Sequence, residues 1–265
     1  MNKKTSKKIR EKILEMVAVS RSGHIASSFS IVEILLALYF NILKVNPLKP
    51  NDPDRDRFIL SKAHGCSALY TVLAQRGFFS EKILDTFCQT GSILGGHPER
   101  GKVPGIEVSA GSLGHGLSIG AGIALAAKRD FKNFRAFALL GDGECDEGSV
   151  WEAALFAVHY KLDNLTVIVD YNKFQASGKI SEIIGVEPLA EKWKSFGWEV
   201  AEVDGHNEAE LVKILGKVPL FEGKPNAIIA HTIKGKGVSF MEENPAWHTG
   251  IPNSDDFFLA KEELR

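Results

Sequence analysis

Cysteine is scarce in this sequence, with three in 265 residues, at Cys66, Cys88 and Cys145. They are widely spaced and form no C-x-x-C pair, which argues against a disulfide framework or a zinc site. The charged start is not followed by a small-residue cleavage site, so no secretory signal peptide is indicated. We therefore expect a soluble protein of the reducing cytoplasm.

Long apolar runs and an excess of one charge are also missing. The longest apolar stretch, residues 31–40, is interrupted by Glu33 and is too short to span a bilayer. The chain has 32 basic and 33 acidic residues, so it has no broad electrostatic attraction for nucleic acid. Its one basic run is expected to form the solvated face of a first helix. That run consists of Lys3, Lys4, Lys7, Lys8 and Arg10.

Two glycine-rich nucleotide motifs are absent as well. A dinucleotide fingerprint beginning at Gly141 would need a third glycine where Asp146 stands, and no G-x-x-x-x-G-K-[ST] occurs. No internal repeat or linker composition divides the chain, and its length suits one large α/β domain. We expect a single domain over residues 1–265.

The most informative stretch that is present runs from Gly141 to Asn172. One apolar run, residues 134–140, leads into Gly-Asp-Gly, and a second ends at Asp170-Tyr-Asn172. Both runs have the continuous hydrophobicity of buried parallel strands, and residues 148–161 between them have an amphipathic helical pattern. This βαβ unit predicts an acid and an amide at one sheet edge, where open α/β sheets bind ligands.

The residue types at this edge suit a metal-bound diphosphate. An aspartate oxygen, an asparagine oxygen and a backbone carbonyl form the hard oxygen set that Mg²⁺ prefers, completed by phosphate oxygens and water. Gly141 and Gly143 allow the backbone to approach a diphosphate closely. The spacing of Asp142 and Asn172 across the βαβ unit is therefore typical of a cofactor site.

The segment GDGECDEGSVWEAALFAVHYKLDNLTVIVDYNKFQASG, residues 141–178, resembles the thiamine diphosphate motif of transketolases. The resemblance implies an α/β fold in which helices flank both faces of a parallel sheet. The pyrimidine-binding and C-terminal domains of the family have no match, so the chain resembles the N-terminal subunit of a split transketolase. Further matching segments in family order are SGHIASS, SKAHG at 61–65, GGHPE at 95–99, GSLGHG at 111–116 and HTIKGKG at 231–237.

This resemblance implies thiamine diphosphate and Mg²⁺ as cofactors. The implied metal ligands are Asp142, Asn172 and the backbone carbonyl of Phe174. His64 and Gly143 are implied to hold the diphosphate. The other residues expected around the cofactor are Gly141, Gly111, Ser112 and Leu113, the last three lying near its thiazolium and pyrimidine rings.

Five of the eight histidines lie beside glycines in predicted loops: His24, His64, His97, His115 and His206. A single loop histidine is most often an ordinary polar residue, but several at one sheet edge can bind phosphate oxygens or relay protons. By resemblance, His24, His97 and His248 face the sugar substrate. His115 stands where many family members have glutamine. His159 and His231 are expected to be structural.

Two further pairs of charged residues have competing explanations. Acids in a first helical turn stabilise the helix dipole, which accounts for Glu147 without any function. In the family, however, glutamates matching Glu147 and Glu152 link two active sites across a dimer interface. Lys234 and Lys236 either form a basic rim for phosphorylated sugars or are merely solvated.

The implied reaction transfers a two-carbon glycolaldehyde unit from a ketose phosphate to an aldose phosphate. In the family, the cofactor-activating glutamate and the main phosphate-binding arginines come from the pyrimidine-binding domain. We therefore expect a partner chain in an α₂β₂ assembly, while the donor and acceptor sugars stay open. Alternatives are half of another thiamine enzyme, such as a deoxyxylulose-phosphate-synthase-like one, or a non-catalytic scaffold; the histidines favour ketose chemistry.

Sequence patterns also predict several elements around this site. Ser30 and Glu33 have the spacing of a capping box, which would open a buried helix extending to about Leu43. Residues 90–112 are rich in glycine and are expected to be irregular. Other expected strands lie at 57–60, 199–203 and 226–233, and other helices at 113–128, 188–196 and 208–215.

Overall fold

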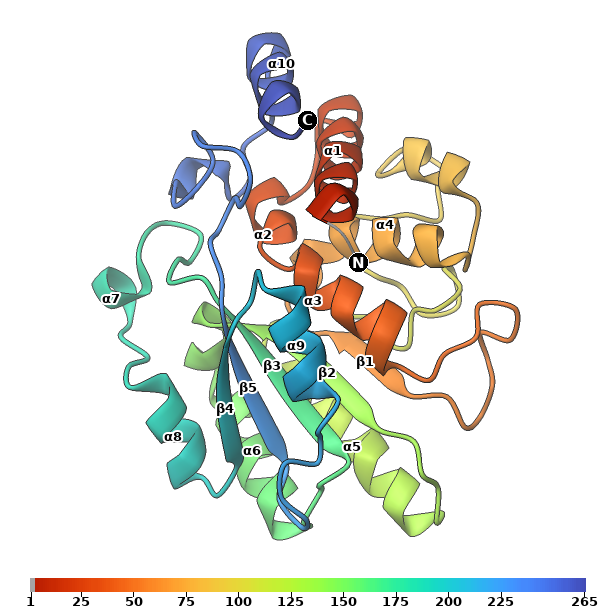
Figure 1. Cartoon of the computed structure of the whole chain (residues 1–265), viewed down its shortest axis with the longest axis vertical. Helices are drawn as coiled ribbons and strands as arrows, with labels where there is room; N and C mark the ends of the chain where they lie inside the picture. Colours follow the sequence, from red (N-terminus) through yellow and green to blue (C-terminus); the bar gives the residue numbers. More distant parts are fainter. Residues whose placement is uncertain (1–2) are drawn as a thin grey trace.

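A computed structural model of the chain describes residues 3–265. In this part of the chain, five parallel strands form one sheet in the order β1-β2-β3-β5-β4 (Figure 1). The predicted βαβ unit is confirmed, because β2 and β3 pair in parallel with Gly141 opposite Asp170. The strands are β1 (Arg57–Leu60), β2 (Ala136–Gly141), β3 (Leu165–Tyr171), β4 (Glu199–Asp204) and β5 (Asn226–His231).

Helices cover both faces of the sheet, as expected (Figure 1). On one face lie α1 (Lys3–Ser20), α2 (Ile25–Phe29), α3 (Val32–Ala37), the π-helix η1 (Leu38–Ile42), α4 (Cys66–Arg76) and α9 (Glu208–Leu215). On the other lie α5 (His115–Arg129), α6 (Gly148–His159) and α8 (Leu189–Ser195). The short or peripheral elements are η2 (Ala63–Gly65), η3 (Glu81–Thr86), η4 (Gly143–Asp146), α7 (Ile180–Ile183), η5 (Pro245–Trp247) and α10 (Ser254–Glu263).

The alternation of side chains along β2 divides the core in two. Phe137 and Leu139 pack with the first group of helices, whereas Ala138 and Leu140 pack with the second. The small residues of α5 bring that helix close to the sheet. A Cβ added at Gly120 would lie 3.3 Å from the side chain of Ile59. The central strands β2 and β3 are buried on both faces, which explains their continuous hydrophobicity, whereas the edge strand β4 is only partly buried.

Two expectations about the N-terminal third are wrong. Ser30 and Glu33 form no capping box: α3 begins after Ile31 without a side-chain cap, and Ser30 Oγ donates to Asp170 Oδ2 at 2.8 Å. Arg10 is not on the solvated face of α1, because it is 4% exposed and paired with Glu33. Both errors have the same physical cause, since these side chains bond to partners far away in sequence. The side chain of Lys3 lies outside the described residues.

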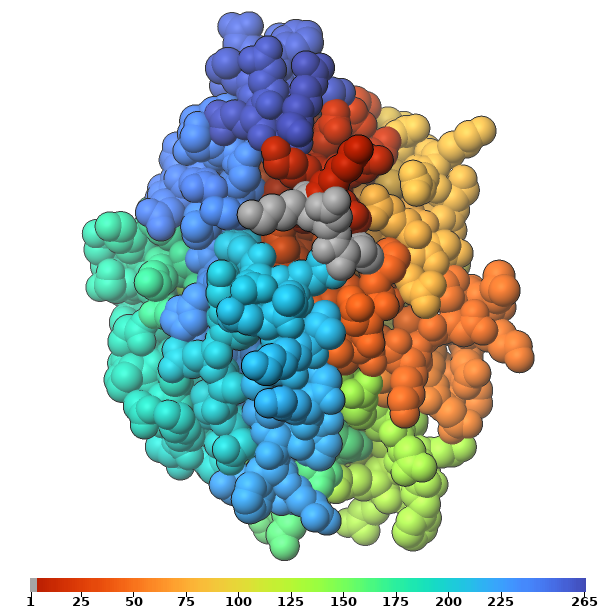
Figure 2. All heavy atoms as spheres, viewed as in Figure 1, coloured from red at the N-terminus to blue at the C-terminus, as the bar shows by residue number. Residues whose placement is uncertain are grey.

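The C-terminal helix α10 packs beside α1 (Figure 1), and Lys261 Nζ lies 3.2 Å from Glu11 Oε1 and 3.0 Å from Glu15 Oε1. From the side shown in Figure 2, α9 closes against the α3–η1 segment to form a continuous surface. No helix within residues 3–265 is both long enough and apolar enough to cross a membrane.

Candidate active site at the carboxyl edge of the sheet

Four segments of the chain meet beyond the carboxyl ends of the strands. Residues 61–65 follow β1, residues 141–144 end β2, residues 172–175 follow β3 and residues 232–234 follow β5. Parallel strands deliver these segments to the same edge, so residues distant in sequence become neighbours. The edge is the place that the motif spacing predicts.

Four histidines cluster at this edge. The ring of His24 lies 5.2 Å from that of His64, 5.2 Å from that of His248 and 6.3 Å from that of His97, centroid to centroid. Among the described residues, the buried Nδ1 of His24 has no hydrogen-bond partner. These are the histidines that the sequence assigns to the cofactor and the sugar, and the fold brings them together.

Burial keeps three of these imidazoles neutral near pH 7. It lowers the pKa of His64 well below its usual value, and the Lys62 ammonium adds to the effect. Burial and the neighbouring Lys234 lower the pKa of His248 to about 3. Burial and His97 lower the pKa of His24. A neutral imidazole both donates and accepts a hydrogen bond, so the cluster can bind hydroxyl groups and move protons between them.

A buried ion pair lies beneath the histidines. Lys62 and Asp170, which are 1% and 0% exposed, are paired through Lys62 Nζ and Asp170 Oδ2. The same carboxylate accepts hydrogen bonds from Ser30 Oγ at 2.8 Å, from Asn172 Nδ2 at 3.0 Å and from Thr232 Oγ1. Burial alone would raise the pKa of Asp170, but Lys62 and these donors lower it. Asp170 is therefore an ionised hub that fixes three strand-end segments relative to one another.

Asp142 is bonded to the segment that carries Asn172, at the sheet edge where the sequence predicts both. Asp142 accepts the backbone N–H groups of Gly143, at 2.8 Å, and Lys173, while Asn172 Oδ1 accepts that of Phe174 at 3.1 Å. Burial and the nearby Asp170 carboxylate raise the pKa of Asp142 to about 7. A buried carboxylate this unfavourable as an anion fits a site that takes a cation.

The donor chemistry here favours a hard divalent ion rather than zinc. Within the described residues, no group of three or more histidine, cysteine or acidic side chains could hold a metal ion. One carboxylate, one amide oxygen and a backbone carbonyl are instead the oxygen ligands typical of Mg²⁺. The donor chemistry of Asp142, Asn172 and the Phe174 carbonyl is therefore compatible with the Mg²⁺ ion that the sequence predicts.

Glu144 connects three of the glycine motifs. Its carboxylate accepts hydrogen bonds from Gly114 N at 2.8 Å, from Gly141 N at 3.0 Å and from the Ser61 hydroxyl. Burial raises its pKa despite these donors. Nothing in the local sequence singles out Glu144, because its partners lie in segments far away along the chain.

Lys234 belongs to the site, whereas Lys236 does not. Lys234 is 1% exposed and its Nζ contacts the carbonyl oxygen of Gln175 at 2.7 Å and His248 Nδ1 at 3.0 Å. Burial, together with Lys62, lowers its pKa to about 8. Lys236 instead pairs with Glu242 at 3.3 Å. Lys62 is a further member that sequence reasoning misses, although it stands within the SKAHG segment, two residues before His64.

Two glycine-rich segments line the outer part of the site. A Cβ on Gly111 would lie 3.7 Å from the His97 ring, so residues 111–113 pass beside the histidines; Gly111 and Ser112 are exposed, and Leu113 is half-buried. Tyr70 Oη lies 3.1 Å from the carbonyl oxygen of Gly95 and 3.0 Å from that of His97, so its single proton can bond to either and hold the His97 segment.

Several other candidates lie apart from the cluster. Glu147 and Glu152 are exposed at the start and in the first half of α6, and His115 is exposed at the start of α5. His206 bonds to Glu33 at 2.9 Å instead of facing the histidines, and His231 pairs with Glu202 at 2.7 Å.

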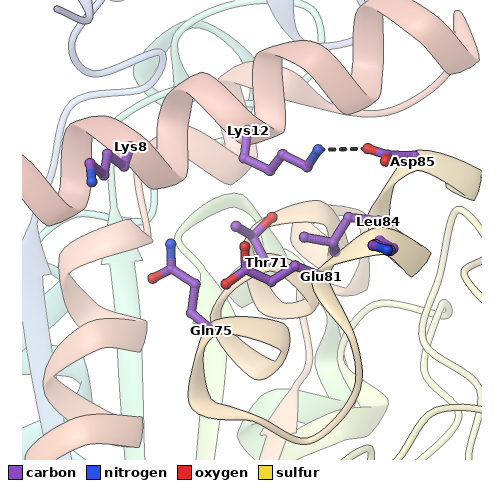
Figure 3. A pocket seen from close by; sticks show the side chains of 8 residues that line it. Lys8, Lys12, Thr71, Gln75, Glu81, Leu84 and Asp85 are labelled. Carbon is purple, nitrogen blue, oxygen red and sulfur yellow. Dashed lines mark hydrogen bonds and ion pairs between the residues drawn. The ribbon is translucent and has the colours of Figure 1, made fainter.

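Hollows elsewhere on the surface do not compete with this site. Figure 3 shows one between α1, α4 and η3, with a volume of about 330 Å³, where Lys12 Nζ pairs with Asp85 at 2.6 Å. It is lined by a mixture of surface lysines and acids, without the buried, oriented donors that the strand-end site has.

The fold and the site together define a thiamine diphosphate-binding domain. The family described as the transketolase thiamine diphosphate-binding domain matches residues 1–264, and the chain belongs to this family. The transketolase from Leishmania mexicana has the same fold, with a TM-score of 0.92 and 29% identity. That match covers 100% of this chain but 41% of the other, so the chain spans about two fifths of that transketolase.

Two relatives of similar length are named as transketolase subunits. The chain is 44% identical over 259 residues to one subunit of the apulose-4-phosphate transketolase of Phocaeicola vulgatus, covering 98% of this chain and 92% of that one. It is 45% identical over 240 residues to the 6-deoxy-6-sulfo-D-fructose transketolase subunit SqwG of a Clostridium species, covering 91% and 87%. The predicted resemblance to a transketolase subunit is confirmed.

Proposed function

We propose that this chain is the N-terminal subunit of a transketolase and works with a second chain. The observation that carries the proposal is the meeting of the buried Asp142–Asn172 oxygen set with a four-histidine cluster at one sheet edge. Together they offer a place for a metal-bound diphosphate next to a place for a polyhydroxylated substrate. The reaction is transfer of a two-carbon glycolaldehyde unit from a ketose phosphate to an aldose phosphate.

The cofactors are thiamine diphosphate and Mg²⁺. Asp142, Asn172 and the Phe174 carbonyl would hold the metal, and His64 and Gly143 would bind the diphosphate. We add Lys62 and Lys234 to this group, because both ammonium groups are buried at the same edge. When bound, thiamine diphosphate supplies the nucleophilic carbon that the side chains of the protein lack.

The histidines bind and orient the sugar. His24, His97 and His248 would exchange hydrogen bonds with substrate hydroxyl groups. The Nδ1 of His24, which has no partner among the described residues, is available as a donor or acceptor for such a group. Lys234 donates to the Gln175 carbonyl, and its contact with His248 Nδ1 keeps that ring turned toward the cluster.

The second chain would supply the pyrimidine-binding half. We propose that residues 1–265 form one diphosphate-binding domain and that the assembly is α₂β₂. Glu147 and Glu152 would then be covered by the partner and link two active sites. In support, α5 and α6 expose apolar side chains beside these acids, among them Ile119, Leu155 and Phe156. The three free cysteines agree with the reducing cytoplasm as its location.

The substrate is a ketose phosphate or a chemically related sugar. The two relatives above are named for different sugars, apulose 4-phosphate and 6-deoxy-6-sulfofructose. Both sugars carry a negatively charged group, which a basic site can recognise. The buried Lys62 and Lys234 lie at the cofactor end, so we assign the group that distinguishes one sugar from another to the partner chain.

The test is reconstitution with the second chain. We expect the pair, with Mg²⁺ and thiamine diphosphate, to transfer a two-carbon unit from a ketose phosphate to an aldose phosphate in a steady-state assay. The chain alone is expected to bind the cofactor weakly and to show little turnover. Full turnover by the chain alone would overturn the half-site proposal. Cofactor binding without ketol transfer would favour a scaffold. Turnover only with pyruvate as donor would favour half of a deoxyxylulose-phosphate-synthase-like enzyme.

A further inference from the structure

His206 sits in a network of buried polar groups outside the histidine cluster. Its Nδ1 lies 2.9 Å from Glu33 Oε2, and its Nε2 lies 2.9 Å from the backbone nitrogen of Ile233. Glu33 is held in turn by two hydrogen bonds from Arg10, at 2.6 and 2.7 Å. The ring thus bridges a helix-borne ion pair and the segment that follows β5.

The two contacts of His206 define a single tautomer. A backbone N–H can only donate, so Nε2 must be the acceptor and the ring proton must be on Nδ1. Burial alone would raise the pKa of Glu33, but hydrogen bonds from His206 and Arg10 outweigh it and lower the pKa to about 2. An ionised Glu33 accepts the Nδ1 proton, which fixes both the tautomer and the orientation of the ring.

The turn before α9 is docked tightly on the same segment. Gly205 N donates to the carbonyl oxygen of His231 at 2.8 Å, next to the bond between Ile233 and His206. Gly205 has no side chain, and a Cβ there would overlap the methyl group of Thr232. Glycine is therefore needed for the close approach that brings the His206 ring to Ile233.

The segment that His206 holds carries two groups of the active site. Thr232 donates to the Asp170 carboxylate, and Lys234 contacts the carbonyl oxygen of Gln175 and His248. Ile233 lies between them. We infer that His206 is a positioning residue of the cofactor site: its Nε2 holds the Ile233 amide and thereby places Thr232 and Lys234. This inference rests on the proposed function of the edge.

Two substitutions separate the contacts of the ring. In His206→Gln, the amide oxygen can occupy the ε position and accept from Ile233, so thiamine diphosphate affinity should stay within about threefold of the wild type. In His206→Asn, the amide reaches Glu33 but not Ile233, and affinity should fall on the order of tenfold, the equivalent of about 1.4 kcal/mol. Rescue by glutamine but not by asparagine is a result that general destabilisation does not produce.

The matched control is Asn207→Ala on the same turn. Asn207 caps α9 by accepting from Glu210 N at 3.3 Å, so its loss destabilises that helix. We expect a lower unfolding midpoint with unchanged cofactor affinity. In His206→Asn, we expect a similar decrease in the unfolding midpoint together with a marked loss of cofactor affinity.

The experiment uses the full chain together with its partner. Calorimetric titration with Mg²⁺ and thiamine diphosphate gives the affinities. In the absence of cofactor, nitrogen NMR of the ring reports the tautomer of His206, and amide exchange reports the protection of the Ile233 N–H. A wild type that binds no cofactor would overturn the proposed function. If the wild type binds cofactor, either of two results would overturn the role of His206 alone. One is a His206→Asn variant with the same affinity as the wild type, and the other is a His206 ring protonated on Nε2.

Discussion

Two buried carboxylates in this protein, Glu33 and Asp142, have pKa values shifted in opposite directions. Burial raises the pKa of both, but donors from His206 and Arg10 bring that of Glu33 down to about 2. At Asp142, burial and the adjacent Asp170 carboxylate raise the pKa to about 7. Glu33 finds its cation within the chain, whereas Asp142 finds two backbone N–H groups and a second anion. The difference supports the proposal that Glu33 has a structural role and that Asp142 binds a cation from outside the chain.

Glu144 is an intermediate case that supports this interpretation. It accepts three hydrogen bonds from neutral donors, yet burial still raises its pKa. Neutral hydrogen-bond donors therefore stabilise a buried carboxylate less than a positively charged partner does. Four substitutions at and around these acids test the contrast, in order of decreasing effect.

Removing Lys62 should have the largest effect, because it leaves another buried carboxylate, Asp170, without a cation. Lys62→Met leaves Asp170 buried without its ammonium partner, and breaking such a pair costs about 3–5 kcal/mol. Urea unfolding of the variant should show this loss. The double variant Lys62→Met/Asp170→Asn should recover part of it, because it removes the uncompensated charge. A single variant as stable as the wild type would show that the pair is not a structural hub.

Glu33→Gln should remove the stabilisation that the ionised Glu33 carboxylate gives to the folded protein. The pKa of Glu33 falls from 4.5 to about 2 on folding, so its ionised form stabilises the protein above pH 4.5. That contribution, about 3 kcal/mol, should disappear as the pH falls from 4.5 toward 2. Unfolding free energies of wild type and variant should therefore differ at pH 6 and converge near pH 2. A difference that does not change with pH would contradict this account.

Asp142→Asn should remove the buried carboxylate whose ionised form is unfavourable. The amide removes the buried charge, but its nitrogen faces one of the two backbone N–H groups that Asp142 accepts, so these two changes should largely offset each other in the stability of the cofactor-free protein. Affinity for Mg²⁺ and thiamine diphosphate should fall on the order of 100-fold. Calorimetric titration and thermal unfolding measure the two effects separately. The control is Glu191→Gln, a surface acid paired with Lys194, which should change neither. Unchanged cofactor affinity in Asp142→Asn would remove Asp142 from the metal site.

Glu144→Gln should have the smallest effect. The amide oxygen can still accept from Gly114 and Ser61, but the amide nitrogen would face the N–H of Gly141. One unsatisfied donor costs about 1–3 kcal/mol, and the cofactor affinity should weaken by a few-fold. Amide exchange at Gly141 should increase while that at Gly114 changes little. Equal protection of both in the variant would contradict the three-way contact.

The sequence predicted the strands and several of the residues that meet at their carboxyl edge. Asp142 and Asn172 follow continuous apolar runs, so their meeting at one edge follows from the βαβ pattern alone. The cluster of His24, His64, His97 and His248 also follows from motif order, once the resemblance is accepted. Local patterns carry this information because most of these motifs end a strand or begin a helix.

The remaining groups could not be found in this way. Arg10 and Glu33 are 23 residues apart, and Glu33 and His206 are 173 apart, so no periodicity relates them. The apparent capping box at Ser30 shows how a local signal loses to long-range partners, because Asp170 takes the hydroxyl and Arg10 the carboxylate. Lys62 and Lys234 resemble solvated lysines until the fold buries them.

The histidine cluster has a consequence for how the protein is made. Ser27 and His248 lie 3.5 Å apart across 221 residues of sequence. Contacts this distant close late, because the entropy of a long loop must be overcome first, and parallel sheets fold slowly for the same reason. A growing chain on the ribosome cannot complete the pocket until residue 248 has emerged. The sugar-facing part of the proposed site is therefore completed after its cofactor-facing part, whose residues His64, Asp142 and Asn172 lie earlier in the chain.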